Sequence, residues 1–423
     1  MSQMQQFNEI RVQNFKSLRD VTFRPGRLSV LIGPNGGGKS NLVDAIRFIA
    51  LTYQRGLDKA DFEFGGINSY RHANANKEEP VGFGLSANLP NELYQSAVNL
   101  NPAGVLDNWG VIDYSFGLDV NDVVSERFQL NYYRPGEEFR GYCFERDFNA
   151  YKQVHPPAPY DLHDLKPLPS WIQPKGYRAV PFDAERRANS SLKHNLWFTG
   201  LGVVNENPIA DTTVYRLFPN VLREFGVKGS PYSDRQRPEM LGMNGAHLPS
   251  IIRYLQEHHQ DRYAMLEELL ESAIPNYGGL VAESNNIVTK LYFQDKYLNR
   301  LLGADEVSEG IIRLIALAGA IVLPYSVCVV IEEPENHLHP WALDSFIKLC
   351  REISEFKQII LTTHSPLLWD AVNPDEVWVV SNQRGETQLD KLTELDPTIA
   401  GKWDKGLQLA SYLNGGAVRK AVP

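Results

Sequence analysis

A glycine-rich loop near the start of the chain has the residue types and spacing of a phosphate-binding site. In "GPNGGGKS", Gly33 and the run Gly38-Lys39-Ser40 satisfy the P-loop pattern G-x-x-x-x-G-K-[ST], with an apolar run before and a helical pattern after it. Glycines let successive N–H groups point into one concavity, and the helix N-terminus adds partial positive charge. We expect Lys39 to reach nucleotide β- and γ-phosphates and the Ser40 hydroxyl to ligate Mg²⁺. The expected nucleotide contacts are Asn35, Gly36, Gly37, Gly38, Lys39, Ser40 and Asn41.

A second set of chemical groups lies about 290 residues later, in "VCVVIEEPENHLHP" (Val327–Pro340). The β-branched run predicts a buried parallel strand, and carboxylates at its C-terminal end lie where open α/β sheets bind ligands. We expect Glu332 to hold the Mg²⁺ shell and Glu333 to polarise the attacking water as general base. Most P-loop proteins carry Asp at the first position, so Glu332 is a departure whose longer arm could act through a metal-bound water. The alternative is an ordinary polar loop.

Two shorter motifs complete the set. "VSEGIIRLIALAGAI" (Val307–Ile321) places Ser308 and Gly310 at the start of a helix, where N–H groups and a hydroxyl make an anion site. "QIILTTHSPLL" is a further apolar strand that ends in His364, which could sense or stabilise a γ-phosphate. Ser308 could instead be a plain helix N-cap, and His364 a satisfied loop histidine. The order of all four motifs favours a single nucleotide site.

That order resembles the ABC-type ATPase heads of the SMC, RecF and OLD (overcoming lysogenisation defect) group, and in detail the OLD-like prokaryotic ATPases. "IRVQNFKSLRDVTF" (Ile10–Phe23) is similar to their opening strand pair, with Lys16 in the turn. "SEG", "IEEPENHLHP" and "TTHSP" are similar to their signature, Walker B and switch stretches, and "MNGAHLPSIIRYL" to a stretch before the signature. The similar motifs cover roughly 1–55 and 240–385.

The resemblance implies ATP and Mg²⁺ as cofactors and a head-to-head homodimer or a higher oligomer. ATP would lie between Gly33–Ser40 of one subunit and Ser308–Gly310 of the other, and Lys16 would join the nucleotide contacts. OLD-like ATPases without a nuclease domain accompany a separate effector in prokaryotic antiviral defence. A sensor or scaffold for a toxin or nuclease on another chain is therefore implied. His337 stands where many relatives have a small residue.

The resemblance also predicts the architecture: an α/β P-loop NTPase of ABC-head type, with a mixed sheet core, a β-rich lobe, a helical lobe and an insertion. We expect an N-terminal ATPase half over 1–150, an insertion over 151–240 and a C-terminal ATPase half over 241–423. Alternating runs between Val81 and Phe148 predict antiparallel strands. After His364 only 59 residues remain, which we expect to be too few for the Toprim nuclease domain of OLD proteins.

The composition and charge of the chain limit the classes of partner that we expect. The net charge of −9 gives no global attraction to nucleic acid or acidic membranes. Residues 171–237 hold ten Lys and Arg against six Asp and Glu, so this insertion could contact nucleic acid, or be a solvated insert or protein interface. Leu314–Ile331 imitates a membrane span, but Pro324 predicts a core helix, a turn and a strand. Three cysteines without metal or disulfide spacing and no visible signal peptide predict a cytoplasmic protein without a membrane anchor.

Other functions remain as alternatives. A RecF-like clamp would close on duplex DNA with ATP, and would lose salt-sensitive binding on neutralising Arg186 and Arg187. A self-contained nuclease needs an acidic metal cluster outside the ATP site, and the sequence shows none. The OLD-like sequence around the motifs disfavours a transporter ATPase.

Overall fold

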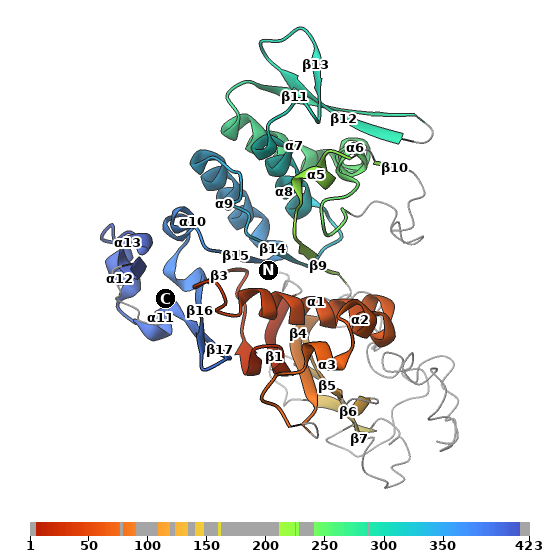
Figure 1. The fold of residues 1–423 in the computed structure, drawn as a ribbon, viewed down its shortest axis with the longest axis vertical. Coiled ribbons are helices and arrows are strands. Elements are labelled where there is room, and N and C mark those ends of the chain that lie inside the picture. Colours follow the sequence, from red (N-terminus) through yellow and green to blue (C-terminus); the bar gives the residue numbers. More distant parts are fainter. Residues whose placement is uncertain are drawn as a thin grey trace. The chain divides into compact units, whose positions relative to one another are not determined.

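The chain folds into two compact units, each assembled from segments far apart in the sequence (Figure 1). The computed structural model describes residues 6–76, 79–89, 109–118, 123–133, 140–147, 160–161, 211–224, 226–227, 241–285 and 288–414. The first unit comprises Met1–Gly26, Ser40–Thr212 and Asn382–Leu389, and the second comprises Arg27–Lys39, Thr213–Ser381 and Asp390–Pro423. Lys39 and Ser40 of the glycine loop therefore belong to different units.

An antiparallel sheet of seven strands forms the first unit, in the order β2-β1-β4-β5-β6-β7-β8. The strands are β1 (Gln6–Phe15), β2 (Leu18–Phe23), β4 (Val81–Leu89), β5 (Trp109–Leu118), β6 (Val123–Tyr133), β7 (Arg140–Asp147) and β8 (Tyr160–Asp161). The hairpin of β1 and β2 turns at Lys16 and Ser17, because Phe15 pairs with Leu18. This confirms the predicted opening strand pair and β-rich lobe.

Helix α1 (Lys39–Arg55) packs against this sheet through aromatic side chains. Phe48 stacks on Phe83 of β4, with ring centroids 4.9 Å apart and planes 11° apart, and its centroid lies 5.9 Å from that of Phe15. Aromatic pairs of this kind add ~0.5–1.5 kcal/mol beyond their burial. The cluster fixes the helix that begins at the glycine loop. Two short helices, α2 (Leu57–Glu63) and α3 (Ile67–Tyr70), follow it.

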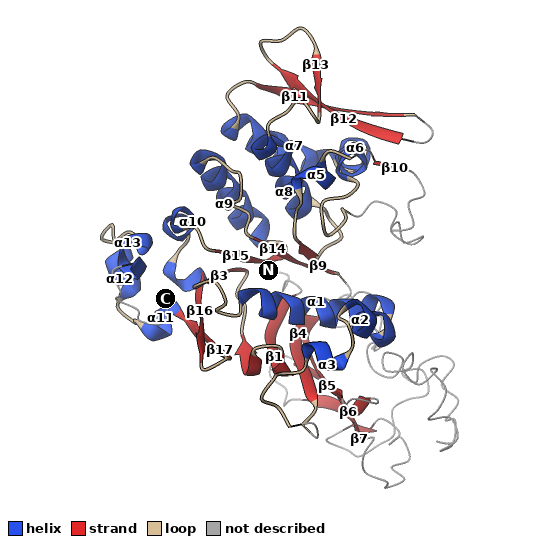
Figure 2. Ribbon diagram, in the orientation of Figure 1, coloured by secondary structure: helices blue, strands red, loops and turns tan. Residues whose placement is uncertain are grey.

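A six-stranded sheet of order β17-β16-β3-β15-β14-β9 holds the parallel strands of the second unit and lies to one side of helices α5 to α9 (Figure 2). Its strands are β3 (Leu28–Ile32), β9 (Thr212–Tyr215), β14 (Cys328–Glu332), β15 (Gln358–Thr363), β16 (Val377–Gln383) and β17 (Glu386–Lys391). The four strands β16, β3, β15 and β14 run parallel. Every residue of β3 and β15 is buried, which explains why both strands are rich in Val, Ile and Leu. The carboxyl ends of parallel strands share one edge, so this sheet gathers the loops that follow them.

Helices and a small sheet complete the second unit. The helices are α5 (Pro219–Leu222), α6 (Leu248–His258), α7 (Gln260–Ala273), α8 (Glu309–Val322), α9 (Pro340–Ser354), α10 (Pro366–Ala371), α11 (Leu392–Leu395), α12 (Ile399–Trp403), α13 (Leu409–Asn414) and a 3-10 turn, Pro374–Glu376. The small sheet has the order β10-β12-β11, with β13 beside β12. Its strands are β10 (Gly226–Val227), β11 (Tyr277–Ser284), β12 (Val288–Asp295) and β13 (Leu301–Gly303).

The long apolar segment Leu314–Ile331 is confirmed as a core helix, a turn and a strand, since it comprises most of α8 and β14. Among the described residues, no helix is long and apolar enough to cross a membrane. The predicted division at residues 150 and 240 stays a prediction. Most of the expected insertion and of the basic stretch 171–237 lies outside the described residues.

Candidate functional site

The glycine loop after β3 has the backbone that only glycine accepts easily. Gly33, Gly36 and Gly38 have φ values of +148°, +76° and +110°, where other residues are strained. A Cβ on Gly33 would lie 1.9 Å from the carbonyl oxygen of Val380 in β16, whereas one on Gly36 would meet nothing within 4 Å. The loop is therefore pressed against the sheet on one side and open on the other, as a phosphate cradle requires.

Lys39 is the buried cation of this loop, with 5% of the residue exposed. Its ammonium donates to the carbonyl oxygens of Gly33 (2.7 Å) and Pro34 (3.1 Å) and lies 3.3 Å from Nδ1 of His364. Burial lowers the pKa of Lys39 to about 8, against the opposing effect of Glu333 and Glu335. Because its hydrogen bonds within the described part of the chain go to neutral groups, this buried ammonium would gain from a close negative partner. The loop therefore fits an anion such as a phosphate.

His364 follows β15 and connects the lysine to a carboxylate. Its Nε2 atom lies 3.4 Å from Oε1 of Glu333, while Nδ1 faces Lys39. Burial, followed by the charge of Lys39, lowers the pKa of His364 below its usual 6.5. The imidazole is therefore neutral near pH 7, and it can accept at Nδ1 and donate at Nε2. The structure thus brings together three predicted site residues in the line Lys39–His364–Glu333.

Glu333 directly follows β14 in a left-handed backbone conformation, with φ of +49°. Its N–H donates to the carbonyl oxygen of Thr362 (2.9 Å), and its Oε2 accepts from the Asn336 amide (2.8 Å). Its carboxylate is 42% exposed, so water can reach it. These contacts give Glu333 the access and the fixed direction that a general base needs.

Glu332, the last residue of β14, is directed elsewhere. Its carboxylate is bonded to the guanidinium of Arg216, and its side chain is only 12% exposed. A carboxylate at this strand end fits the metal role that we predicted, provided that a cation replaces the guanidinium. No group of three or more His, Cys, Asp or Glu side chains that could hold a metal ion occurs in the part of the chain that the structure describes.

Two functional residues were missed by the sequence reasoning, and the first is Glu335. Its Oε1 accepts from the Thr363 hydroxyl (2.6 Å) and from the N–H groups of His364 (3.0 Å) and Ser365 (3.2 Å). It therefore fixes the loop that carries His364. The available signal was the third acid in the run "EEPE".

The second missed residue is Arg313 of α8, which is 3% exposed. Its guanidinium donates to the carbonyl oxygens of Leu217 (2.9 Å) and Glu333 (2.8 Å). Arg313 therefore links α8, which carries the signature residues, to the backbone of Glu333, the expected base. The available signal was an arginine at the start of an otherwise apolar helix.

The signature residues lie at the start of α8. Ser308 is its N-cap, since its hydroxyl accepts from the N–H of Ile311 at 3.4 Å. This is the plain capping role that the sequence left open, and it does not test the nucleotide role. A Cβ on Gly310 would lie 2.5 Å from the carbonyl oxygen of His337, whose Nε2 is 3.2 Å from Glu309 Oε1. The helix start therefore packs tightly against the loop that follows β14.

The remaining predicted contacts belong to the first unit, apart from Asn35. The Lys16 ammonium is bonded to the Asp44 carboxylate and lies 5.5 Å from the centre of the Phe64 ring. The Asn41 amide donates to the Ser17 hydroxyl at 2.6 Å. Ser40 and Asn35, one in each unit, are both exposed. The contacts of Lys16 and Asn41 hold the β1–β2 turn against α1, and the nucleotide roles of Lys16, Ser40, Asn41 and Asn35 stay predictions.

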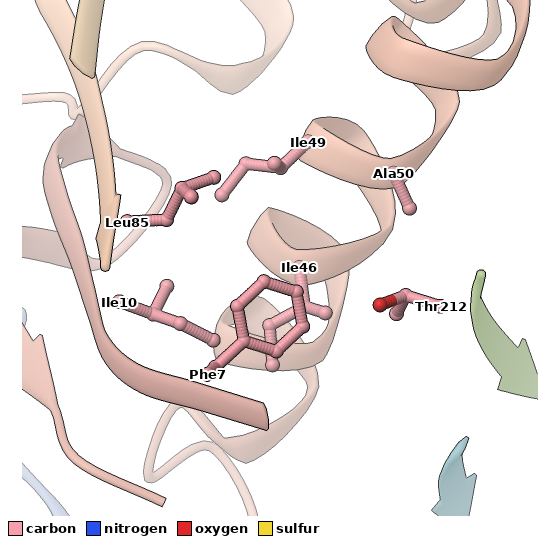
Figure 3. Close-up of a pocket in the computed structure, with 7 residues that line it drawn as sticks. All are labelled: Phe7, Ile10, Ile46, Ile49, Ala50, Leu85 and Thr212. Atoms are coloured by element: carbon pink, nitrogen blue, oxygen red, sulfur yellow. The ribbon is translucent and has the colours of Figure 1, made fainter. Parts of the chain in front are cut away.

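The first unit also holds a small pocket beside α1 (Figure 3). It is lined by Phe7, Ile10, Ile46, Ile49, Ala50, Leu85 and Thr212. Six of these side chains are apolar and the seventh carries a hydroxyl. The pocket lining offers no charged group for a phosphate, so it does not compete with the glycine loop as a nucleotide site.

Comparison with known proteins agrees with this geometry. A family model described as "AAA domain, putative AbiEii toxin, Type IV TA system" matches residues 28–370, well over half of the chain. The DNA replication and repair protein RecF of Prosthecochloris aestuarii is 37% identical over 60 residues, which are 14% of this chain and 16% of RecF. The chromosome partition protein Smc of Coxiella burnetii is 39% identical over 66 residues, 14% of this chain and 6% of Smc.

The chain thus matches less than a fifth of the length of either relative. A solved structure supports the fold over a longer range: the SMC head bound to the C-terminal winged-helix domain of ScpA. It superposes with a TM-score of 0.50 at 15% identity, over 91% of this chain and 96% of that one. This confirms the predicted α/β P-loop fold of ABC-head type. The protein has the fold of an ABC-type P-loop ATPase head, and it belongs to the AAA-domain family whose model matches residues 28–370.

Proposed function

We propose that the chain binds ATP with Mg²⁺ and hydrolyses it in a head-to-head homodimer, or in a higher oligomer built from such dimers. The observation that carries this proposal is the line Lys39–His364–Glu333. It connects a phosphate-binding lysine to a carboxylate that can accept a proton from water. Ser308–Gly310 of a second copy would close the site.

Each residue of the line has a separate task. Lys39 exchanges its carbonyl partners for phosphate oxygens, which relieves the cost of its burial. Glu333 holds its carboxylate toward water and accepts the proton of the attacking molecule, while Asn336 fixes its second oxygen. Neutral His364 accepts from Lys39 at Nδ1 and donates from Nε2 to Glu333. It therefore fixes the positions of the ammonium and the carboxylate relative to each other. Mg²⁺, held by Ser40 and Glu332, would neutralise phosphate charge when bound.

The test is Glu333→Gln, with Lys39→Ala as the matched variant. Glu333→Gln removes the base but leaves the phosphate-binding groups, so it should bind a fluorescent ATP analogue, hydrolyse ATP at least ~100-fold more slowly and elute as a stable dimer with ATP and Mg²⁺. Lys39→Ala should lose binding itself. Hydrolysis by Glu333→Gln at the wild-type rate would refute the assignment of the base.

We infer that the switch serves a separate effector, a toxin or a nuclease, in prokaryotic antiviral defence. The OLD-like motifs support this role, as does a family description that names a toxin–antitoxin system. The solved SMC head is itself bound to a domain of another protein. In this role, ATP closes the dimer, hydrolysis opens it, and the differential contacts hold and then release the effector.

A RecF-like DNA clamp is the second candidate, and the match to RecF favours it. The two candidates are separated by capturing tagged Glu333→Gln protein from its host with ATP and Mg²⁺, followed by mass spectrometry. A second protein in near-stoichiometric amount supports the effector role and identifies its chemistry. Nucleic acid without a protein partner supports the clamp, with residues 171–237 as the first segment to test for the contact.

A further inference from the structure

Arg216 is a cation placed directly on the carboxylate that we assign to Mg²⁺. It follows β9, the edge strand that neighbours β14 in the sheet, and Glu332 is the last residue of β14. Its guanidinium Nε is bonded to Oε1 of Glu332. The sequence motifs gave Arg216 no role beyond the positive charge of residues 171–237.

The backbone around Arg216 holds it in this place. Its N–H donates to the carbonyl oxygen of Met243 (2.8 Å), and the N–H of Phe218 donates to that of Asn244 (3.0 Å). The carbonyl oxygen of Leu217, between them, accepts from Arg313. Three consecutive residues are thus anchored to two other segments of the second unit. These backbone hydrogen bonds fix the position from which the Arg216 side chain reaches Glu332.

The burial of the two partners is unequal. The Glu332 side chain is 12% exposed and that of Arg216 is 33% exposed. A carboxylate so far removed from water needs a cation beside it, because an unpaired buried charge is strongly unfavourable. The more exposed guanidinium can move into water when it is released. If a metal ion replaces the guanidinium of Arg216 at Glu332, neither the carboxylate nor the guanidinium is therefore left buried without a partner.

We propose that Arg216 occupies the Glu332 carboxylate while no metal is bound, and that Mg²⁺ must displace it. Arg216 is then a positioning residue that sets the metal concentration at which the nucleotide is held. Mg²⁺ is usually bound by one or two carboxylates together with substrate phosphates, so nucleotide phosphates would help it to displace the guanidinium. The exchange therefore makes metal binding conditional on nucleotide. This inference rests on the proposed ATP and Mg²⁺ site.

The experiment measures metal affinity directly. Mn²⁺, which is visible by electron paramagnetic resonance, is titrated into the full chain with a non-hydrolysable ATP analogue. The proteins compared are wild type, Arg216→Lys, Arg216→Gln, Glu332→Gln and the double variant Arg216→Gln/Glu332→Gln. Removal of the competing charge should tighten Mn²⁺ binding about tenfold in Arg216→Gln and less in Arg216→Lys. In the Glu332→Gln background, Arg216→Gln should have no further effect.

The sign of the change in Mn²⁺ affinity distinguishes an Arg216 that competes with the metal from one that only orients Glu332. If Arg216 only orients Glu332, Mn²⁺ binding becomes weaker in Arg216→Gln, and weaker or unchanged binding overturns the proposal. Should Arg216→Gln fail to fold by circular dichroism, the sign of the Arg216→Lys shift decides in the same way. If the wild type binds no nucleotide, or if Lys39→Ala binds it equally well, the proposed function fails. If binding depends on Lys39 but Mn²⁺ affinity ignores Arg216, only this inference fails.

Discussion

Arg313 offers the sharpest test of how the signature helix reaches the expected base. The substitution Arg313→Met keeps the length and apolar stem of the side chain and removes both of its hydrogen bonds. The carbonyl oxygens of Leu217 and Glu333, which accept at 2.9 and 2.8 Å, would lose this donor. Because the residue is only 3% exposed, water cannot easily take its place.

The size of the effect depends on two opposing contributions. Each buried carbonyl that loses a charged donor costs ~1–3 kcal/mol. Removing a buried guanidinium also relieves its desolvation, which offsets part of that loss; its Nε has no hydrogen-bond partner among the described residues. We expect the free energy of unfolding to fall by ~2–4 kcal/mol.

The rate of ATP hydrolysis by Arg313→Met should fall by more than its loss of folding stability explains. Glu333 has a left-handed backbone that costs a non-glycine residue ~1–2 kcal/mol, and Arg313 holds its carbonyl group. Without that bond the backbone can relax and move the carboxylate, and a displacement of ~1 Å can cost ~100-fold in rate. Nucleotide binding through Lys39 should change less than about threefold, since its contacts do not involve Arg313.

The assay combines urea denaturation, steady-state ATP hydrolysis and binding of a fluorescent nucleotide. Arg253→Met is the matched control, because Arg253 makes an exposed pair with Glu257 at 2.7 Å on α6. Such a pair contributes only ~0.3–0.5 kcal/mol. If Arg313→Met unfolds at the same urea concentration as Arg253→Met and hydrolyses ATP at the wild-type rate, Arg313 does not hold Glu333.

Three further predictions concern single residues of the second unit. Burial lowers the pKa of Lys357 to about 7 from 10.5, so between these values the unfolded chain binds the extra proton and stability should rise with pH. Lys357→Met should flatten that slope of up to ~1.4 kcal/mol per pH unit, measured by denaturation from pH 7 to 10; an unchanged slope would contradict it. Gly33→Ala should abolish the native fold or lower its melting temperature sharply, since the new Cβ meets a β16 carbonyl oxygen at 1.9 Å; thermal unfolding like the wild type would count against this packing. Glu335→Ala should loosen the loop that carries His364 and slow hydrolysis ~10-fold or more, with nucleotide binding kept; a normal hydrolysis rate would exclude that support role.

The strand and helix pattern of the nucleotide core could be predicted because local signals and burial agree there. β3 and β15 are buried at every position, so their centres are rich in Val, Ile and Leu, and the glycine loop marks the end of β3 and the start of α1. The sequence does not mark the break between α6 and α7 at His259. The segment "EHHQD" contains neither proline nor glycine, the residue types that most often end a helix.

The contacts that hold the site together were not predictable in the same way. Arg216, Arg313 and Glu335 act on residues 116, 20 and up to 30 positions away in the chain, so no spacing rule connects them to their partners. Each is also a common residue type whose ordinary place is the surface. Only the fold shows which carbonyl or carboxylate each one meets.

The three carboxylates of "EEPE" show why residue type alone could not assign them. Glu332 is mostly buried against a guanidinium, which suits a group that must always face a cation. Glu333 is half-exposed and lies 3.4 Å from an imidazole nitrogen, which suits the role of base that we propose for it. Glu335 accepts from a hydroxyl and two N–H groups at its Oε1 atom, which suits a group that fixes the backbone of a loop. The same functional group therefore meets a guanidinium, an imidazole and the backbone within four residues, and these surroundings support the three different roles that we propose.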